Sequence, residues 1–167
     1  TEISRFQAVM NVNFYGSLML TKILTPSISN KKDGRVVFVS SVAGMLGLYG
    51  FSAYSASKFA VEGLAQSLRN ELSITKAKVC VLYPPDTDTP MLEKENLDKP
   101  EVTKAISDGV LQSPEYVAKA ALKGIAKGTY EIVPGFKNRV NCFLIRHFPT
   151  ITRIVLDRTA KQVTAKA

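Results

Sequence analysis

The sequence of 167 residues predicts an α/β protein built on a doubly wound parallel sheet whose first strands are missing. Segments with helical and strand-like patterns alternate along the chain, and the strand-like segments are nearly continuous apolar runs, as expected of strands covered on both faces. A helical pattern also opens the chain, with no strand before it on which it could pack. We therefore expect the C-terminal part of a larger domain, with the N-terminal strands of its sheet absent.

A helix and a strand are the first two predicted elements. Residues 1–24 carry a stripe at helical spacing, formed by Val9, Met10, Asn13, Leu20 and Leu24. After a polar turn, residues 35–39 form a β-branched apolar run, which predicts a buried strand. A loop containing Gly44, Gly47 and Gly50 follows this strand.

The next helix and strand are predicted over residues 54–73 and 78–83. The helix has an apolar stripe composed of Val61, Leu64, Ala65, Leu68 and Leu72. We expect Glu62 and Glu71 on its solvated side. Pro84 and Pro85 end the strand, because proline cannot donate to the hydrogen-bond ladder of a sheet.

The remaining part of the sheet domain begins with a segment, residues 86–112, that we expect to be irregular. Ser113, Pro114 and Glu115 then give a helix start with an N-cap serine, a proline at the first position and a carboxylate in the first turn. Residues 129–133 are predicted as a last short strand. In such sheets ligands bind beyond the carboxyl ends of the strands, which are followed here by Ser40 and Ser41 and by residues 84–90.

Composition and charge exclude several classes of function. The net charge of +8 comes from lysines and arginines that are spread along the chain, without a basic run interleaved with aromatic residues, so we expect no nucleic-acid partner. The two cysteines form no metal-binding pattern, so no metal site is predicted, and unpaired thiols favour a reducing compartment. The sequence contains no uninterrupted run of about 18 apolar residues, which is the length that a bilayer-spanning helix needs.

The residues that carry chemistry are a tyrosine and a lysine at helical spacing. Tyr54 and Lys58 are four residues apart and share one helix face. A nearby ammonium lowers the pKa of a tyrosine, whose ordinary value near 10 is too high for efficient proton transfer. By itself the pair is also compatible with two surface residues. Ser41, at the end of a buried strand, could hold a substrate oxygen, and Asn13 is a polar residue on an apolar helix face that could hold a water or be solvated.

These residues and their surroundings resemble the active site of the short-chain dehydrogenase/reductase family, whose fold is Rossmann-like. The resemblance rests on residues 12–16 (VNFYG), residues 36–44 (VVFVSSVAG) and residues 54–58 (YSASK), with the order Asn, Ser, Tyr, Lys and the gaps between them. It covers nearly the whole chain up to about Val133. It implies an oxidoreductase that transfers hydride between a nicotinamide cofactor and a carbonyl or alcohol.

The family resemblance assigns a role to each of four catalytic residues. Tyr54 would be the general acid in reduction, and Lys58 would lower its pKa and bind the ribose hydroxyls of the cofactor. Ser41 would orient the substrate oxygen, with the neighbouring Ser40 as the alternative, since strand alternation turns only one of the two toward the substrate. Asn13 would anchor a water that connects Lys58 to solvent.

The cofactor contacts implied by the family are Tyr54, Lys58, Pro84, Pro85, Thr87 and Thr89. The family pattern Pro-Gly-x-Val-x-Thr is altered here, because Pro85 replaces the glycine and Thr87 the valine. A proline-stiffened turn without cofactor contact is the alternative for this stretch. The glycine-rich phosphate loop of the family is absent from these residues, so we expect the isolated chain to be inactive.

Two segments resemble a subgroup of the family that reduces 3-ketodihydrosphingosine with NADPH. They are residues 83–90 (YPPDTDTP) with the downstream pairs Glu95-Asn96 and Lys99-Pro100, and residues 47–53 (GLYGFSA). The resemblance implies NADP(H) rather than NAD(H), and a location in the cytoplasm or at the cytosolic face of the endoplasmic reticulum membrane. The alternatives are a reductase for another hydrophobic ketone or alcohol, or a truncated noncatalytic dimerisation module.

We expect the chain to divide into residues 1–136, which belong to the Rossmann-like domain, and residues 137–167, a basic and apolar helical extension. Pro149 breaks this extension in two, so that neither half spans a bilayer. It could lie in a membrane interface, cover a lipid-chain pocket, or pack on the domain or on a second subunit. The family resemblance also implies a homo-oligomer formed through the helices around Asn13 and Tyr54.

Overall fold

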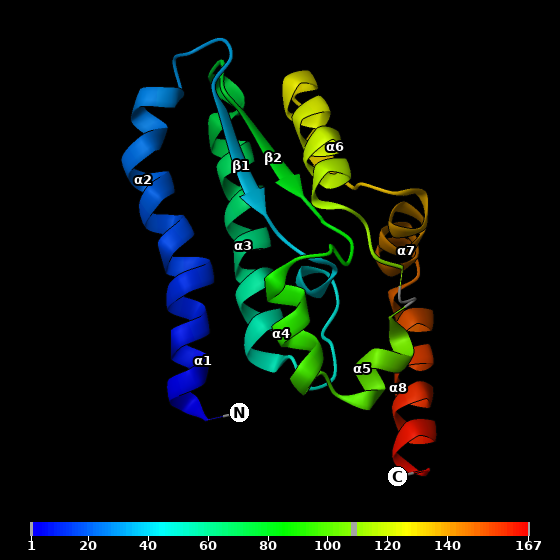
Figure 1. Ribbon diagram of the computed structural model, residues 1–167. Coiled ribbons are helices and arrows are strands. Elements are labelled where there is room, and N and C mark those ends of the chain that lie inside the picture. Colours follow the sequence, from blue (N-terminus) through cyan, green and yellow to red (C-terminus); the bar gives the residue numbers. More distant parts are fainter. Residues whose placement is uncertain (1, 108–109, 167) are drawn as a thin grey trace.

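The fold, given by a computed structural model that describes residues 2–107 and 110–166, is an α/β sandwich around a parallel sheet (Figure 1). The sheet contains β1 (Arg35–Val39), β2 (Lys78–Leu82) and β3 (Glu131–Ile132), paired in the order β1-β2-β3 with all strands parallel. The register pairs Val37 with Cys80 and Leu82 with Ile132. The predicted parallel α/β class is therefore confirmed, in the form of a three-stranded sheet within the described ranges.

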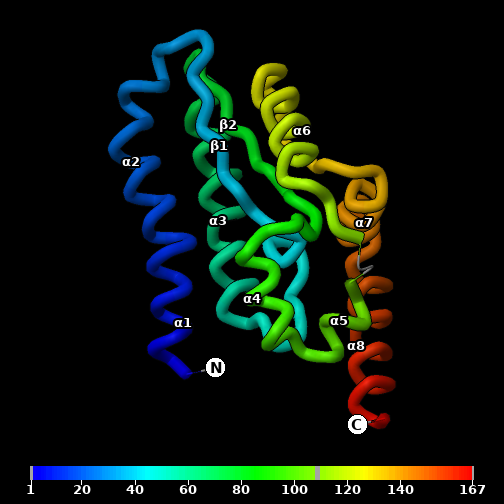
Figure 2. Tube along the Cα trace, in the orientation of Figure 1, coloured from blue at the N-terminus to red at the C-terminus, as the bar shows by residue number. Residues whose placement is uncertain are grey.

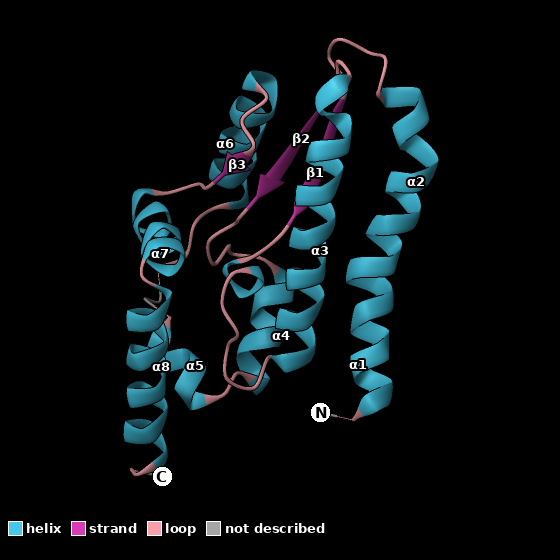
Figure 3. Ribbon diagram, turned by 180° about the vertical axis from the view of Figure 1, so that it is seen from behind, coloured by secondary structure: helices cyan, strands magenta, loops and turns pink. Residues whose placement is uncertain are grey.

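Helices lie on both faces of this sheet (Figure 3), with α3 packed on one face and α6 on the other. The helices in the described ranges are α1 (Ile3–Met10), α2 (Gly16–Ile28), α3 (Ser52–Glu71), α4 (Pro90–Asp98), α5 (Glu101–Ile106), α6 (Pro114–Lys127), α7 (Phe136–His147) and α8 (Pro149–Thr164). A π-helical turn (Asn11–Tyr15) joins α1 to α2, and short 3₁₀ turns lie at Val42–Gly44 and Leu72–Ile74.

Alternate residues of β2 point to opposite faces and create two cores. Val79 and Val81 pack with Phe38 of β1 against the buried side of α3. Cys80 and Leu82 pack on the other face against Ala121 of α6, together with Ile132. Since every residue of β2 after Lys78 is buried, the continuous apolar run in the sequence reflects a strand covered on both sides.

The long first helix differs from the sequence prediction in what it buries. Leu20 and Leu24, predicted on the buried stripe, are 62% and 48% exposed. Val9, Met10 and Asn13 are partly buried, because α1 and the π-helical turn pack along α3. The apolar spacing correctly predicts a helix, but α2 diverges from α3 (Figure 1), and apolar side chains of α2 such as Met19 and Ile23 stay exposed.

The segment predicted as irregular contains two helices, and this prediction was wrong. Thr89 is the N-cap of α4, where its hydroxyl accepts a hydrogen bond of 3.4 Å from the Leu92 backbone N–H, and Pro90 occupies the first helical position. Helix α5 is tied to the loop that precedes α3, since the Thr103 hydroxyl donates to the Tyr49 carbonyl at 2.6 Å. Residues 108 and 109 of this segment lie outside the described ranges.

Helix α6 begins as the sequence predicts. The Ser113 hydroxyl accepts a hydrogen bond of 3.2 Å from the Tyr116 backbone N–H, and Pro114 follows at the first position of the helix. The helix ends at Gly128, whose φ of 66° lies in the left-handed region.

The C-terminal extension forms the pair α7 and α8, with the break at Pro149. Helix α7 packs on the domain by burying Asn138, Cys142 and Ile145, whereas α8 buries no residue completely. Figure 2 shows α8 running past α5, and the two helices are in contact. None of the helices in the described part of the chain has the length and apolarity that a bilayer crossing requires.

Candidate active site

Tyr54 and Lys58 lie in the first two turns of α3, at the carboxyl end of β1. The Lys58 Nζ lies 5.5 Å from the centre of the Tyr54 ring and donates a hydrogen bond of 2.9 Å to the carbonyl oxygen of Val39, the last residue of β1. Strand end and helix start therefore meet at the place where α/β sheets bind ligands.

Of the two serines that follow β1, Ser41 lies beside Tyr54. Its side chain forms a hydrogen bond with the tyrosine, and its Oγ accepts a second one of 3.2 Å from the Ala43 backbone N–H, which caps the 3₁₀ turn. Ser40 is 2% exposed, and its Oγ has no hydrogen-bond partner among the described residues. Extended backbone at the strand end turns the two side chains to opposite faces, as the alternation requires.

Burial sets the proton affinity of both side chains. It raises the pKa of Tyr54 above its ordinary value, the Ser41 hydrogen bond lowers this pKa, and the Glu95 and Asp86 carboxylates raise it again. Burial also lowers the pKa of Lys58. The sequence led us to expect a lowered Tyr54 pKa; the structure has the opposite net direction because desolvation of the phenolate is the largest influence.

Asn13 faces α3 from the π-helical turn. Its Nδ2 donates a hydrogen bond of 2.9 Å to the Ser57 hydroxyl, and that hydroxyl donates one of 2.7 Å to the Tyr54 carbonyl. A π-helical turn inside an α-helix is rare and is found frequently at functional sites. Ser57, which is fully buried, is a site residue to which sequence reasoning gave no role.

The loop after β2 contains the remaining predicted contacts, Pro84, Pro85, Thr87 and Thr89, all partly buried. The Thr87 hydroxyl donates to the Pro85 carbonyl at 2.7 Å, and the Thr89 hydroxyl donates to the Thr87 carbonyl at 3.2 Å. Both predicted threonine contacts are therefore directed into the loop itself in this structure. They stabilise the turn from which α4 starts.

Glu62 was expected on the solvated side of α3, and this prediction was wrong, whereas Glu71 is exposed as predicted. Glu62 is buried, and its Oε2 accepts a hydrogen bond of 2.7 Å from the Tyr83 hydroxyl. The helical pattern places Glu62 next to the apolar stripe. Nothing in the local sequence indicates that a tyrosine 21 residues later will reach it.

A nicotinamide cofactor is implied by the family resemblance, and the Tyr54 and Lys58 end of the site fits it. The Lys58 ammonium has three N–H donors, and the part of the chain described here gives it one acceptor, the Val39 carbonyl. Two donors are thus available for ribose hydroxyls beside the Tyr54 hydroxyl. Lys58 and Tyr54 are the residues that would hold this group.

Together these features define a doubly wound α/β protein with a tyrosine–lysine site for proton transfer at the carboxyl ends of its strands. A family model for short chain dehydrogenases matches residues 1–100. The chain belongs to the short-chain dehydrogenase family, which confirms the resemblance found in its motifs.

Comparison with known proteins gives more specific relatives. The 3-ketodihydrosphingosine reductase of Mus musculus is 45% identical over 130 residues, which are 77% of this chain and 39% of that protein. The reductase of the same name from Dictyostelium discoideum is 47% identical over 130 residues, or 76% of this chain and 39% of that protein. This chain thus spans about two fifths of the length of these relatives.

Solved structures share the fold. A short chain dehydrogenase from Burkholderia cenocepacia J2315, solved in complex with NADP, superimposes with a TM-score of 0.75, covering 93% of this chain and 60% of that one. Its sequence identity of 20% supports the fold alone.

Proposed function

We propose that the protein containing this chain is an NADPH-dependent reductase that converts the ketone of 3-ketodihydrosphingosine to the alcohol. The observation that carries the proposal is the geometry at the N-terminus of α3, where Tyr54, Lys58 and Ser41 meet at the end of β1. The identity of 45–47% to reductases of that name supports the substrate. The resemblance of residues 47–53 and 83–90 to reductases that use NADPH supports the choice of cofactor.

Each side chain of the site has a separate role in the proposed reaction. Because the pKa of Tyr54 is raised, its phenol stays protonated at neutral pH and can donate a proton to the ketone oxygen. The Ser41 hydroxyl, which hydrogen-bonds Tyr54, holds the same oxygen. Lys58 binds ribose hydroxyls and supplies positive charge beside the tyrosinate left after proton transfer. The cofactor supplies the hydride when it is bound.

The proposal is tested with the full-length protein that contains this chain. NADPH oxidation is followed with 3-ketodihydrosphingosine, beside a Tyr54→Phe variant. Turnover that disappears in the variant while NADPH binding persists supports the proposed reaction and the acid role of Tyr54. No turnover by the wild-type protein with intact NADPH binding contradicts this substrate and favours another hydrophobic ketone.

A homo-oligomer formed through the helices around Asn13 and Tyr54 is also proposed. Apolar side chains stand exposed along the π-helical turn and α2, among them Val12 at 74%, Met19 at 64% and Ile23 at 69%. An apolar surface of this kind is typical of an interaction site. A second copy of the chain would cover it.

The C-terminal helices support contact with a membrane interface. Ile151, Ile154 and Val155 of α8 are 46–60% exposed and lie next to Arg153. Apolar residues beside basic ones suit the headgroup region of an anionic bilayer. A position at the cytosolic face of the endoplasmic reticulum would agree with both this surface and the proposed lipid substrate.

A further inference from the structure

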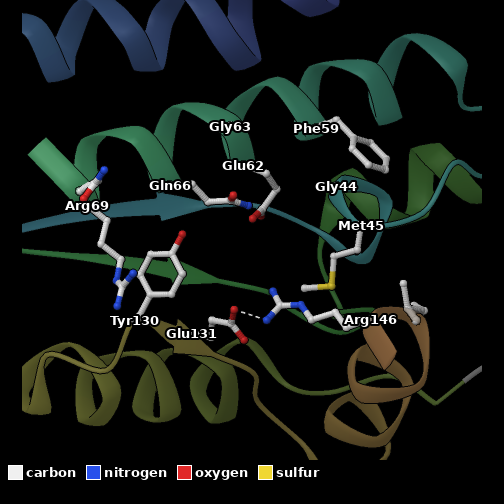
Figure 4. A pocket seen from close by; sticks show the side chains of 12 residues that line it. Gly44, Met45, Phe59, Glu62, Gly63, Gln66, Arg69, Tyr130, Glu131 and Arg146 are labelled. Atoms are coloured by element: carbon white, nitrogen blue, oxygen red, sulfur yellow. Dashed lines mark ion pairs between the residues drawn. The ribbon is translucent and has the colours of Figure 1, made fainter. Parts of the chain in front are cut away.

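A hydrogen-bond network with a buried centre, the hydroxyl of Tyr83, connects α3 to α7. Tyr83, directly after β2, is fully buried. Its hydroxyl donates to Glu62 Oε2 at 2.7 Å and accepts a hydrogen bond of 3.0 Å from Arg146 Nη2. The other terminal nitrogen of Arg146, Nη1, forms an ion pair with the Glu131 carboxylate. Figure 4 shows Glu62, Glu131 and Arg146 around one cleft of about 830 Å³.

Four elements meet in this network. Glu62 belongs to α3, Tyr83 follows β2, Glu131 opens β3, and Arg146 lies in the last turn of α7. Helix α7 is therefore connected to α3, the helix that carries Tyr54 and Lys58, through the Tyr83 hydroxyl. This contact joins residues 62 and 146, which belong to the two parts into which the sequence was expected to divide.

Tyr83 is also held at its backbone. Its N–H donates to the Ile132 carbonyl at 2.9 Å, and its carbonyl accepts a hydrogen bond of 2.8 Å from Asn138 Nδ2 of α7. The next residue is Pro84, where the loop of proposed cofactor contacts begins. Helix α7 thus fixes Tyr83 both at its carbonyl and at its hydroxyl, and with it the start of that loop.

Glu62 links the network to the catalytic groups, because it lies close to them on the same helix, α3. It follows Lys58 by four residues and Tyr54 by eight, so the three lie on neighbouring turns. The 3₁₀ turn that follows Ser41 packs against this same part of α3. A Cβ at Gly44 would lie 3.1 Å from the Lys58 carbonyl oxygen and 3.3 Å from Glu62 Cγ. A displacement of Glu62 would therefore reach Lys58 and the Ser41 turn.

Burial makes the network sensitive to the loss of one member. Glu62 is 7% exposed, and its Oε1 has no hydrogen-bond partner within the described ranges. A buried carboxylate is costly unless it is paired, and here its compensation comes from the Tyr83 hydroxyl and the nearby Arg146 guanidinium. Without them the Glu62 side chain would be left buried and unpaired, and it would have to move toward solvent together with the part of α3 that carries it.

We propose that Tyr83 and Arg146 are positioning residues that act through Glu62, fixing Tyr54 and Lys58 relative to the loop that starts at Pro84. This inference rests on the proposed function, since it concerns the placement of the same catalytic side chains. It gives α7 a part in catalysis, although α7 supplies no group that touches the reacting atoms.

The test uses the full-length protein with Tyr83→Phe, which removes one hydroxyl and keeps the ring, and with Arg146→Met. We expect kcat for NADPH-dependent ketone reduction to fall about 10-fold or more in each, since small displacements of catalytic groups have effects of this size. The KM for the ketone should change much less. The double variant should be no slower than the slower single variant, because both act through Glu62.

Two further variants separate positioning from folding. Arg146→Lys keeps a donor and the charge, so it should recover most of the kcat lost in Arg146→Met. Arg69→Met is the matched control, because Arg69 lines the same cleft but stacks on Tyr130, with its guanidinium carbon 4.7 Å from the ring centre. Its kcat should equal that of the wild type.

The inference is overturned if Tyr83→Phe and Arg146→Met lower only the free energy of unfolding and leave kcat unchanged. If the wild-type protein reduces no ketone, the proposed function fails, and the positioning inference is decided by NADPH affinity. A dissociation constant raised about 10-fold by Tyr83→Phe and unchanged by Arg69→Met would then support it. Equal affinities in the two variants would reject it.

Discussion

The side-chain amide of Asn13 donates a hydrogen bond of 2.9 Å to the hydroxyl of Ser57, a residue 44 positions later. Ser57 is fully buried, and its hydroxyl in turn donates to the Tyr54 carbonyl at 2.7 Å. A continuous chain of hydrogen bonds thus leads from the π-helical turn to the backbone of the proposed proton donor. The contact also joins two segments that the sequence separates by a helix, a strand and a loop.

Replacing Ser57 by alanine should destabilise the protein. The change leaves the Asn13 amide without its acceptor in a partly buried place, and such a loss costs about 1–3 kcal/mol. We expect the free energy of unfolding in urea to fall by that amount. Ser67→Ala, on the exposed side of the same helix, should stay within about 0.5 kcal/mol of the wild type. Equal effects of the two changes would contradict a structural role for the Asn13–Ser57 bond.

The pH dependence of reduction should respond to the carboxylates near Tyr54. The phenol donates its proton only below its pKa, so kcat/KM for reduction should hold at neutral pH and fall at alkaline pH. Because the Glu95 carboxylate raises the pKa of Tyr54, Glu95→Gln should lower this pKa and move the alkaline limb to lower pH. Ser41→Ala removes a hydrogen bond that lowers the pKa, so any residual activity should show the opposite shift.

Glu93→Gln provides the control for this pH experiment. Glu93 lies in α4 like Glu95 but is exposed and is not among the groups that shift the Tyr54 pKa. Its pH profile should coincide with that of the wild type. An alkaline limb that stays in place in Glu95→Gln would argue that another group controls it.

Two glycines near the site should respond in opposite ways to alanine. In Gly44→Ala the new Cβ would lie 2.6 Å from Ser40 Oγ and 3.1 Å from the Lys58 carbonyl oxygen, which belongs to the helix backbone. We expect a loss of about 1–3 kcal/mol of unfolding free energy and a lower kcat. At Gly63, on the open side of α3, a Cβ meets no atom within 4 Å. Gly63→Ala should therefore stabilise the protein by about 0.5–1 kcal/mol.

The urea unfolding midpoints of these two variants give the comparison directly. If Gly44→Ala is as stable and as active as the wild type, the turn after Ser41 is packed against α3 less closely than the structure indicates.

The strands and the long helices could be predicted because their signals are local. The buried strands appear as apolar runs, and the start of α6 appears as Ser113 followed by Pro114. Thr89 and Pro90, which begin α4, carry the same capping signal, but the family motif assigns Thr89 to a cofactor contact. The short α5 has a proline as its N-cap and no side-chain cap, so its sequence offers little to detect.

Within the site, the structure places Ser41, Tyr54 and Lys58, the residues of the sequence motif, at the end of β1. The Tyr83–Arg146 contact joins residues 63 positions apart, and no spacing rule connects side chains across that distance. The periodicity of residues 1–24 likewise defines an apolar face but not what covers it. Long-range contacts depend on how the helices meet, and this is decided by the packing of the whole chain.

The exposed apolar side of α2 should control self-association. Met19 and Ile23 are four residues apart and 64% and 69% exposed, so they form one continuous surface. If a second copy covers it, Ile23→Asp should dissociate the oligomer, because burying a charge in an apolar interface is unfavourable. Light scattering coupled to size-exclusion chromatography measures the mass. Ile74→Asp is the control, because Ile74 lies outside α2 and is 93% exposed, and this change should leave the mass unchanged. A wild-type protein that is monomeric would contradict the proposed interface.

The apolar residues of α8 should control membrane binding if this helix lies in a bilayer interface. The full-length protein is sedimented with phosphatidylserine-containing vesicles at low salt, beside an Ile151→Ser/Ile154→Ser variant. Removing these two partly exposed side chains reduces the apolar area available to the bilayer, so the bound fraction should fall. Leu122→Ser removes an apolar side chain of α6 that is even more exposed, at 67%, and this variant should bind like the wild type. Equal binding of all three proteins would show that α8 does not make the membrane contact. Higher salt should weaken binding only where the neighbouring arginines contribute to it.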